Sequence, residues 1–274
     1  MTDIMTANTK DLIQEAVAQK ASSPAAPKSD RLKNLICQAQ VRDMFRNALQ
    51  EHADSFLASV VDLYTNDRCL QSCSASEVLM EAFKAATLKL PINKQLGFAY
   101  IVPFRDNRQN GKLIPTFQLG YKGYIQLCLR TGAYRHIHAG PVYEGELIGE
   151  NRLTGEVDLS GPRLSDKVIG FSCYLETTNG FSKSQYWSTE RMLAHAKRYS
   201  KSYGSSGSPW TTNFDEMATK TILRNLLSRF GILSIELQAG YLADISSAAD
   251  DEIRNAPPDV ENAVPVEEPT AMVN

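Results

Sequence analysis

Hydrophobic positions in the first part of the chain recur at helical spacing. Residues 31–64 place an apolar side chain every three or four positions, from Leu32 to Leu63, which predicts helical structure along this stretch. A second periodic stretch runs to Leu88 and begins after Ser74, with Glu77 three residues further on. This spacing is typical of a capping box. The sequence therefore predicts a helical amino-terminal part.

The pattern then changes to apolar, aromatic and β-branched runs separated by turn residues. Residues 98–104 and 113–119 flank an Asn-Gly pair at 110–111, and a second Asn-Gly pair at 179–180 joins two further runs. Asn-Gly between such runs predicts a β-hairpin. The predicted strands are 98–104, 113–119, 134–142, 168–177 and 181–187.

Helical periodicity returns between and after these strands. The stretch YGSSGSPW at 203–210 has the composition of a flexible loop. The order of helices, strands and helices predicts an α+β fold, with a mostly antiparallel sheet whose β-hairpins pack on helices. The predicted later helices are 121–130, 189–201, 214–230 and 234–246.

Composition divides the chain into three parts. Residues 1–29 are predicted to form an amino-terminal arm and linker, and residues 30–246 the folded core. Residues 247–274 hold four prolines and many acids with no periodicity, which predicts a disordered acidic tail. The five cysteines, the polar first 20 residues and the lack of a long apolar run lead us to expect free thiols in a cytoplasm.

Charge is segregated along the chain, although the net charge is only −2. Nine basic residues and one acid lie between Lys84 and Arg135, and eight basic residues and three acids between Lys183 and Arg229. From Asp244 onward there are eight acids and one arginine. Asymmetry of this kind indicates an anionic partner for the basic part.

Motifs for nucleotide or metal chemistry are missing from the sequence. Neither GxxxxGK[ST] nor GxGxxG occurs, so we expect no ATP-driven activity. The pairs Cys69-x₃-Cys73 and His136-x-His138 have no second pair at matching spacing. We expect no cofactor, with Mg²⁺ entering only as a modulator. One set, Asp166, Glu176 and Lys183, leaves open a Mg²⁺-dependent nuclease or an ordinary solvent-facing group of charges.

Cationic and aromatic residues alternate in the basic segments, as single-stranded nucleic acid requires for phosphate contacts and base stacking. The residues predicted to contact phosphates are Lys122, Lys197, Arg198, Lys201, Lys220 and Arg224. Those predicted to position the backbone or sugars are Gln118, Tyr121, Tyr203 and Trp210. Those predicted to grip a strand or a neighbouring subunit are Arg105, Arg108 and Lys112. A structural oligomer that binds an acidic protein, such as the tail of a neighbour, stays an alternative.

Three blocks of sequence resemble one family. LPINKQLGFAYIVPF at 90–104, FQLGYKGYIQLCLRTGAY at 117–134, and SPW followed by MATKTILRNLLSRF at 208–230 are similar to the RecT family of phage single-strand annealing proteins. The resemblance implies an ATP-independent recombinase that coats single-stranded DNA and anneals it to its complement in a bacterial host cell.

The same resemblance carries expectations about structure and partners. It implies a Rad52-like annealing core and a homo-oligomer, a ring or helical filament, that holds the annealed duplex DNA. A phage exonuclease would supply the single strand, and the acidic tail would contact a host single-strand-binding protein. No catalytic residue is expected.

Overall fold

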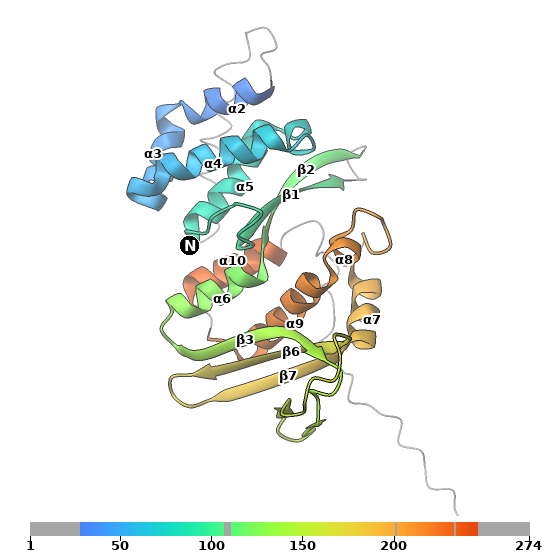
Figure 1. Ribbon diagram of the computed structural model, residues 1–274. Helices are drawn as coiled ribbons and strands as arrows, with labels where there is room; N and C mark the ends of the chain where they lie inside the picture. Colours follow the sequence, from blue (N-terminus) through green and yellow to red (C-terminus); the bar gives the residue numbers. More distant parts are fainter. Residues whose placement is uncertain (1–27, 107–110, 201, 233, 246–274) are drawn as a thin grey trace, which may run out of the picture.

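The described chain begins with a bundle of helices, shown at the top of Figure 1. A computed structural model describes residues 28–106, 111–200, 202–232 and 234–245. Leu32, Phe45 and Leu57 are buried in the interior of the bundle, each at most 3% exposed. Its elements are α2 (Lys28–Ile36), α3 (Ala39–Leu49), α4 (Ala53–Asn66) and α5 (Ala75–Thr87), with 3-10 turns at Gln50–His52 and Leu70–Ser72.

Residues 31–64 are helical, as predicted, but the stretch is divided into three α-helices. Gln38 has an extended backbone, and Gln50 has a positive φ of 53°, a conformation that ends a helix. The apolar period continues across both breaks because each piece turns its own face toward the same interior. Periodicity therefore locates the buried face but not the points where the chain changes direction.

A β-hairpin packs against this bundle. Strands β1 (Ala99–Asp106) and β2 (Lys112–Leu119) pair antiparallel from Ala99 opposite Leu119 to Asp106 opposite Lys112. Ile101 and Phe117 are fully buried, and β2 contacts α5 and α10 (Ile235–Ile245). The hairpin predicted around the first Asn-Gly pair is confirmed.

Helix α5 begins at the predicted place but without a capping box. Ser74 occupies the N-cap position, yet its side chain makes no cap hydrogen bond; its hydroxyl instead lies 2.8 Å from that of Ser76. The carboxylate of Glu77 accepts a hydrogen bond of 2.8 Å from the ammonium of Lys112 on β2. A tertiary ion pair has thus replaced the predicted local contact.

The second half of the chain is a three-stranded antiparallel sheet with helices on one face (Figure 1). Strand β6 lies between β3 and β7, and Gly170 to Glu176 of β6 pair with Ser188 to Ser182 of β7. The Cys173 thiol, 3.5 Å from the Ile222 carbonyl, faces α9. The elements are β3 (Tyr134–Tyr143), β6 (Val168–Thr177), β7 (Ser182–Ser188), α6 (Tyr121–Arg130), α7 (Thr189–Tyr199), α8 (Pro209–Thr212) and α9 (Phe214–Phe230).

Two segments differ from what the sequence indicated. Residues 144–167, for which no element was predicted, carry the short pair β4 (Gly149–Glu150) and β5 (Val157–Asp158). The stretch expected to be a flexible loop contains α8 and is hydrogen-bonded around Ser208, whose hydroxyl accepts from the Trp210 amide at 3.3 Å and lies 3.1 Å from the Ser202 hydroxyl.

The α+β fold class predicted from the sequence is confirmed, with antiparallel hairpins and a helical amino-terminal part. The predicted acidic tail, and the predicted arm up to residue 27, lie outside the described residues. None of the helices in the described ranges is long and apolar enough to cross a membrane. All five cysteines are free thiols.

Candidate nucleic-acid interface

Folding neutralises much of the charge that the sequence concentrates between residues 84 and 135. Four of the nine basic side chains in that segment lie within 2.8 Å of a carboxylate, three of those carboxylates coming from residues 67–81 just before it. A fifth, Arg130, donates to the carbonyls of Leu88 and Lys89 at 2.7 and 2.9 Å, at the end of α5. The four ion pairs are Lys84–Glu81, Lys94–Asp67, Lys112–Glu77 and Arg135–Glu176.

Lys220 and Arg224 face the interior rather than solvent. Their side chains are 11% and 9% exposed, and both point to the carboxylate of Asp244, which is fully buried. The distances to that carboxylate are 2.9 Å from Lys220 Nζ and 3.6 Å from an Arg224 guanidinium nitrogen. They do share one helical face, as their spacing predicts, and that face is turned toward the buried Asp244 carboxylate instead of solvent.

A group of predicted site residues does converge where the hairpin meets α6. Gln118 lies opposite Tyr100 in the register of β1 and β2. The Tyr100 hydroxyl and the Lys122 side chain both lie beside Gly97: a Cβ on that glycine would lie 3.3 and 3.4 Å from them. The Lys122 ammonium is 5.9 Å from the centre of the Tyr121 ring.

Tyr100 links this group to α9. Burial raises the pKa of the Tyr100 hydroxyl, and the nearby charges of Glu216 and Tyr121 raise it further. Glu216 stands in the first turn of α9, so the amino-terminal ends of α6 and α9 approach the same tyrosine. Tyr100 was not among the residues predicted from the sequence to form the site, and its pairing with Gln118 reveals it as part of this group.

The first turn of α6 is suited to an anion. Its N-cap is Gly120, no side chain caps it, and it contains no acidic residue. A Cβ on Gly120 would lie 2.1 Å from the Gly97 carbonyl oxygen, so only glycine allows this close approach. Free backbone amides at a helix start, beside the Lys122 ammonium, form the kind of cradle that binds a phosphate.

A second cationic and aromatic surface lies along α7. The His195 ring stands between Trp187 and Tyr199, with centroid distances of 5.4 and 4.7 Å. The Arg191 guanidinium lies 4.4 Å from the Trp187 ring and that of Arg198 lies 5.3 Å from the Tyr199 ring. Arg191, Lys197 and Arg198 are exposed.

Sequence reasoning identified Lys197 and Arg198 on α7 but missed two neighbours, Arg191 and His195. The spacing 191, 195, 198 on a predicted helix could have revealed them, since residues three or four apart share a face. Figure 1 places α7, α8 and the end of the hairpin where β1 stops and β2 begins along the same side of the molecule.

The remaining predicted residues are dispersed. Trp210 is 8% exposed and packs on Phe214, with ring centres 5.8 Å apart, so it is not available to stack on a base. Tyr203 is half-buried against the core, and Arg105 is exposed near the end of β1. Lys112 is paired with Glu77. Arg108 and Lys201 lie outside the described residues.

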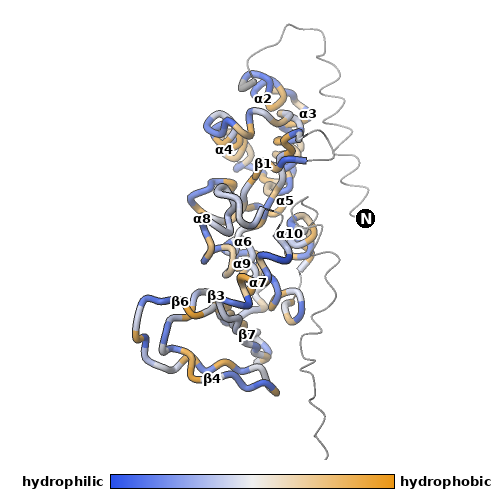
Figure 2. The backbone as a smooth tube through the Cα atoms, turned by 90° about the vertical axis from the view of Figure 1, so that its right-hand side faces the viewer, coloured by the Kyte–Doolittle hydropathy of each residue, from blue (hydrophilic) through white to orange (hydrophobic). Residues whose placement is uncertain are grey.

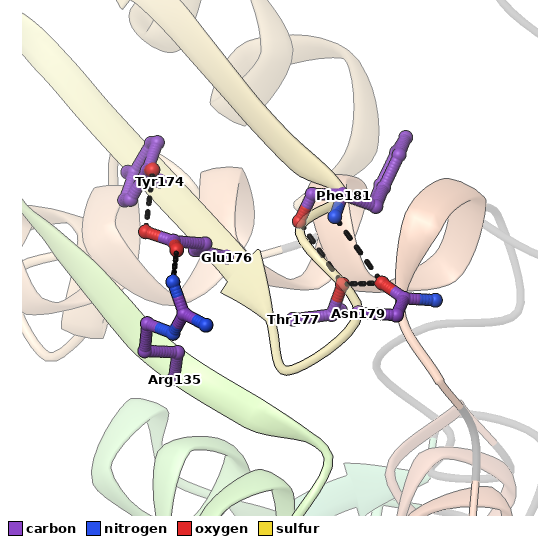
Figure 3. Close-up of polar contacts among 6 residues, drawn as sticks. All are labelled: Arg135, Tyr174, Glu176, Thr177, Asn179 and Phe181. Atoms are coloured by element: carbon purple, nitrogen blue, oxygen red, sulfur yellow. Dashed lines mark hydrogen bonds and ion pairs between the residues drawn. The ribbon is translucent and has the colours of Figure 1, made fainter.

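The nuclease alternative does not fit the geometry. Asp166 and Glu176 lie ten residues apart along an extended chain, roughly 30 Å at the rise of a β-strand. Glu176 is already bound at both oxygens, by Arg135 at 2.8 Å and by the Tyr174 hydroxyl at 3.1 Å (Figure 3). Asp166 pairs with Arg163 at 2.6 Å.

Lys183, the third member of that set, donates to the Thr154 carbonyl. Within the described parts of the chain, no three His, Cys, Asp or Glu side chains are placed to hold a metal ion. Asp166, Glu176 and Lys183 therefore make three separate structural contacts instead of lining one metal site.

An α+β fold with exposed cations beside half-buried aromatic rings, at the uncapped start of α6 and along α7, is typical of proteins that bind nucleic-acid backbones. The chain belongs to the RecT family, whose family model matches residues 54–263. It is 40% identical over 239 residues to YqaK of Bacillus subtilis strain 168, an uncharacterised protein, covering 86% of this chain and 80% of the relative.

A second relative carries the name of the family. Protein RecT of Escherichia coli K12 is 25% identical over 225 residues, covering 81% of this chain and 83% of the relative. Family membership places this chain among the proteins of single-strand annealing in DNA recombination, as the three sequence blocks implied.

Proposed function

We propose that this protein binds single-stranded DNA as a homo-oligomer and anneals complementary strands without ATP. The observation that carries the proposal is the presence of two cationic and aromatic surfaces, one at the start of α6 and one along α7. Both hold cations for which no carboxylate partner is found among the described residues, as at Lys122 and Lys197. The absence of a P-loop motif from the sequence supports independence from ATP.

Each surface has a distinct part in this proposal. The amides of the first α6 turn and the Lys122 ammonium hold a phosphate, while Gln118 and Tyr121 orient the sugar next to it. Lys197 and Arg198 hold further phosphates. The half-buried Tyr199 ring and the arginines along α7 offer planes on which a base can stack.

Annealing follows from where the protein touches the strand. Contacts to the phosphates remove the repulsion between two DNA backbones and leave the base edges free to pair. A row of subunits makes such weak sites cooperative along the strand. No bond is made or broken, so the reaction needs no catalytic residue.

A salt titration of binding tests these roles. The variant Lys122→Ala/Lys197→Ala/Arg198→Ala should bind a fluorescent oligonucleotide more weakly, and the slope of log K against log salt should decrease by about 2, since each phosphate contact to a single strand contributes about 0.7. Annealing of complementary oligonucleotides without ATP should slow in parallel.

The control is Lys167→Ala, which removes a cation that lies 3.5 Å from Glu144 on another part of the surface. It should leave the slope unchanged. If the triple variant binds with the affinity and salt slope of the unaltered protein, these cations are not the binding surface. The predicted contacts with an exonuclease and a host single-strand-binding protein stay predictions.

A further inference from the structure

Asp244, near the end of α10, is bonded to both ends of the segment that forms the phosphate cradle. Its carboxylate accepts from the Leu119 amide at 3.0 Å and from the Tyr124 hydroxyl at 2.8 Å. Leu119 is the last residue of β2 and directly precedes the N-cap Gly120, and Tyr124 lies one turn into α6. The Lys122 side chain and the amides of the first turn lie between these two contacts.

Close backbone packing fixes the other side of the same segment. The Gly120 amide donates to the Phe98 carbonyl at 2.9 Å. A Cβ on Gly123 would lie 2.2 Å from that carbonyl oxygen, so the chain at Phe98 can approach the helix this closely only at a glycine. The first turn of α6 is therefore held between Phe98, just before β1, and Asp244 on α10.

The Asp244 carboxylate is itself fixed from two further directions. Lys220 Nζ lies 2.9 Å from one of its oxygens, and an Arg224 nitrogen lies 3.6 Å from the other. The carboxylate is fully buried, and hydrogen bonds to an ionised acceptor away from water are short and strong. Figure 1 and Figure 2 both show α10 next to α6. One carboxylate thus joins β2, α6 and α9 at the base of the cradle.

We propose that Asp244 is a positioning residue for single-stranded DNA, which acts through the α6 amides and the Lys122 ammonium without touching a phosphate. The inference rests on the proposed function and extends it to α10. Hydrogen bonds from N–H groups to oxygen need about 2.7–3.2 Å between the heavy atoms, so a first turn that shifts by ~1 Å no longer holds a phosphate. Loss of Asp244 and loss of Lys122 should therefore remove the same phosphate contact.

The salt dependence of binding to a fluorescent single-stranded oligonucleotide tests this role. Lys122→Ala should decrease the slope of log K against log salt by about 0.7, the contribution of one phosphate contact, and Asp244→Asn should decrease it equally. In the double variant the decrease should remain about 0.7, because both changes act on one contact. Asp244→Asn combined with Lys197→Ala on α7 should instead give decreases that add, to about 1.4.

A second variant keeps every charge of the network and serves also if Asp244→Asn does not fold. Tyr124→Phe removes only the hydroxyl that donates to Asp244. It should weaken binding less than Asp244→Asn does, and this effect should disappear when Lys122 is already replaced by Ala. Urea unfolding gives the temperature at which each variant is native, and binding is measured there.

Tyr134→Phe is the matched control for the loss of a buried tyrosine hydroxyl. Tyr134 is 6% exposed and lies on β3, and its hydroxyl accepts from the Ile232 amide at 2.6 Å instead of meeting Asp244. This variant should keep the affinity and the salt slope of the unaltered protein. A loss of binding equal to that of Tyr124→Phe would show that any buried hydroxyl has this effect, and would overturn the assignment.

The outcomes separate positioning from general stability and from the proposed function. If the decreases caused by Asp244→Asn and Lys122→Ala add, or if neither Asp244→Asn nor Tyr124→Phe changes the slope, Asp244 is not a positioning residue and the α6 surface stands. If Lys122→Ala alone leaves the slope unchanged, the α6 surface of the proposed function is itself wrong, and the positioning role falls with it.

Discussion

Replacing Asp244 by Ala removes the carboxylate that four donors share in the interior. Its oxygens accept from the Leu119 amide at 3.0 Å, the Tyr124 hydroxyl at 2.8 Å and the Lys220 ammonium at 2.9 Å, with Arg224 at 3.6 Å. These donors come from β2, α6 and α9, so Asp244 ties α10 to the rest of the core.

The stability lost in Asp244→Ala follows from the burial of the carboxylate and its two cations. Asp244 is fully buried, and the side chains of Lys220 and Arg224 are 11% and 9% exposed, so Asp244→Ala leaves two cations without their common partner. Removing one partner of a buried ion pair destabilises a protein by about 3–5 kcal/mol. At about 2–4 °C per kcal/mol for a chain of this size, the melting temperature should fall by about 6–20 °C.

Urea and thermal unfolding at fixed protein concentration measure this loss. The control is Asp166→Ala, which breaks the exposed pair with Arg163, whose side chains are 95% and 45% exposed; a surface pair contributes less than about 1 kcal/mol. Removing the cations as well, in Asp244→Ala/Lys220→Met/Arg224→Leu, should recover part of the loss. A loss below about 1 kcal/mol for Asp244→Ala alone would refute the account of this charge network.

Two further predictions concern thiols and acid stability. In the native protein at pH 8, iodoacetamide should modify Cys37 and Cys69, which are exposed, and spare the three buried cysteines, as mass spectrometry of the peptides would show. Burial raises the pKa of Cys73 to about 11, so its modification at the rate of Cys37 would contradict the structure. Burial alone would raise the pKa of Asp67, but the Lys94 ammonium and two backbone amides lower it below its ordinary value. Since the pKa of Asp67 is lower in the folded state, its ionised form stabilises the fold above the unfolded pKa of about 3.9, and this stabilisation is lost as pH falls through the folded value. The variant Asp67→Asn should therefore lose less unfolding free energy below pH 4 than the unaltered protein. An unchanged acid profile would contradict the role of Asp67 in acid stability.

Elements whose formation depends on local sequence were predictable. Helix α9 begins and ends where its periodicity does, at Phe214 and Phe230, and the β6–β7 hairpin forms around the second Asn-Gly pair. Gly180 there has a φ of 87°, which glycine adopts without strain. In these segments the turn chemistry, the apolar pattern and the tertiary packing agree.

Elements that depend on contacts across the chain were not predictable. Glu77 has the position of a capping-box acid, but Lys112, 35 residues later, takes its carboxylate. Residues 144–167 were not predicted to form an element because their backbone hydrogen bonds place no apolar pattern on the sequence; their large apolar side chains are exposed to solvent instead of packed in a core.

In the candidate site, the number of charged residues is predictable from the sequence, but which of them are paired depends on contacts across the chain. A count of lysines and arginines between residues 84 and 135 cannot distinguish Lys112, which meets Glu77 at 2.8 Å, from Lys122, which lies beside the uncapped start of α6. Asp244 would be counted with the acidic tail, yet it is fully buried against Lys220 and Arg224. Cations with an internal carboxylate add nothing to a phosphate-binding surface. The DNA affinity of this chain should therefore follow Lys122 near α6 and Lys197 and Arg198 on α7, and not the total basic charge of the segments that contain them.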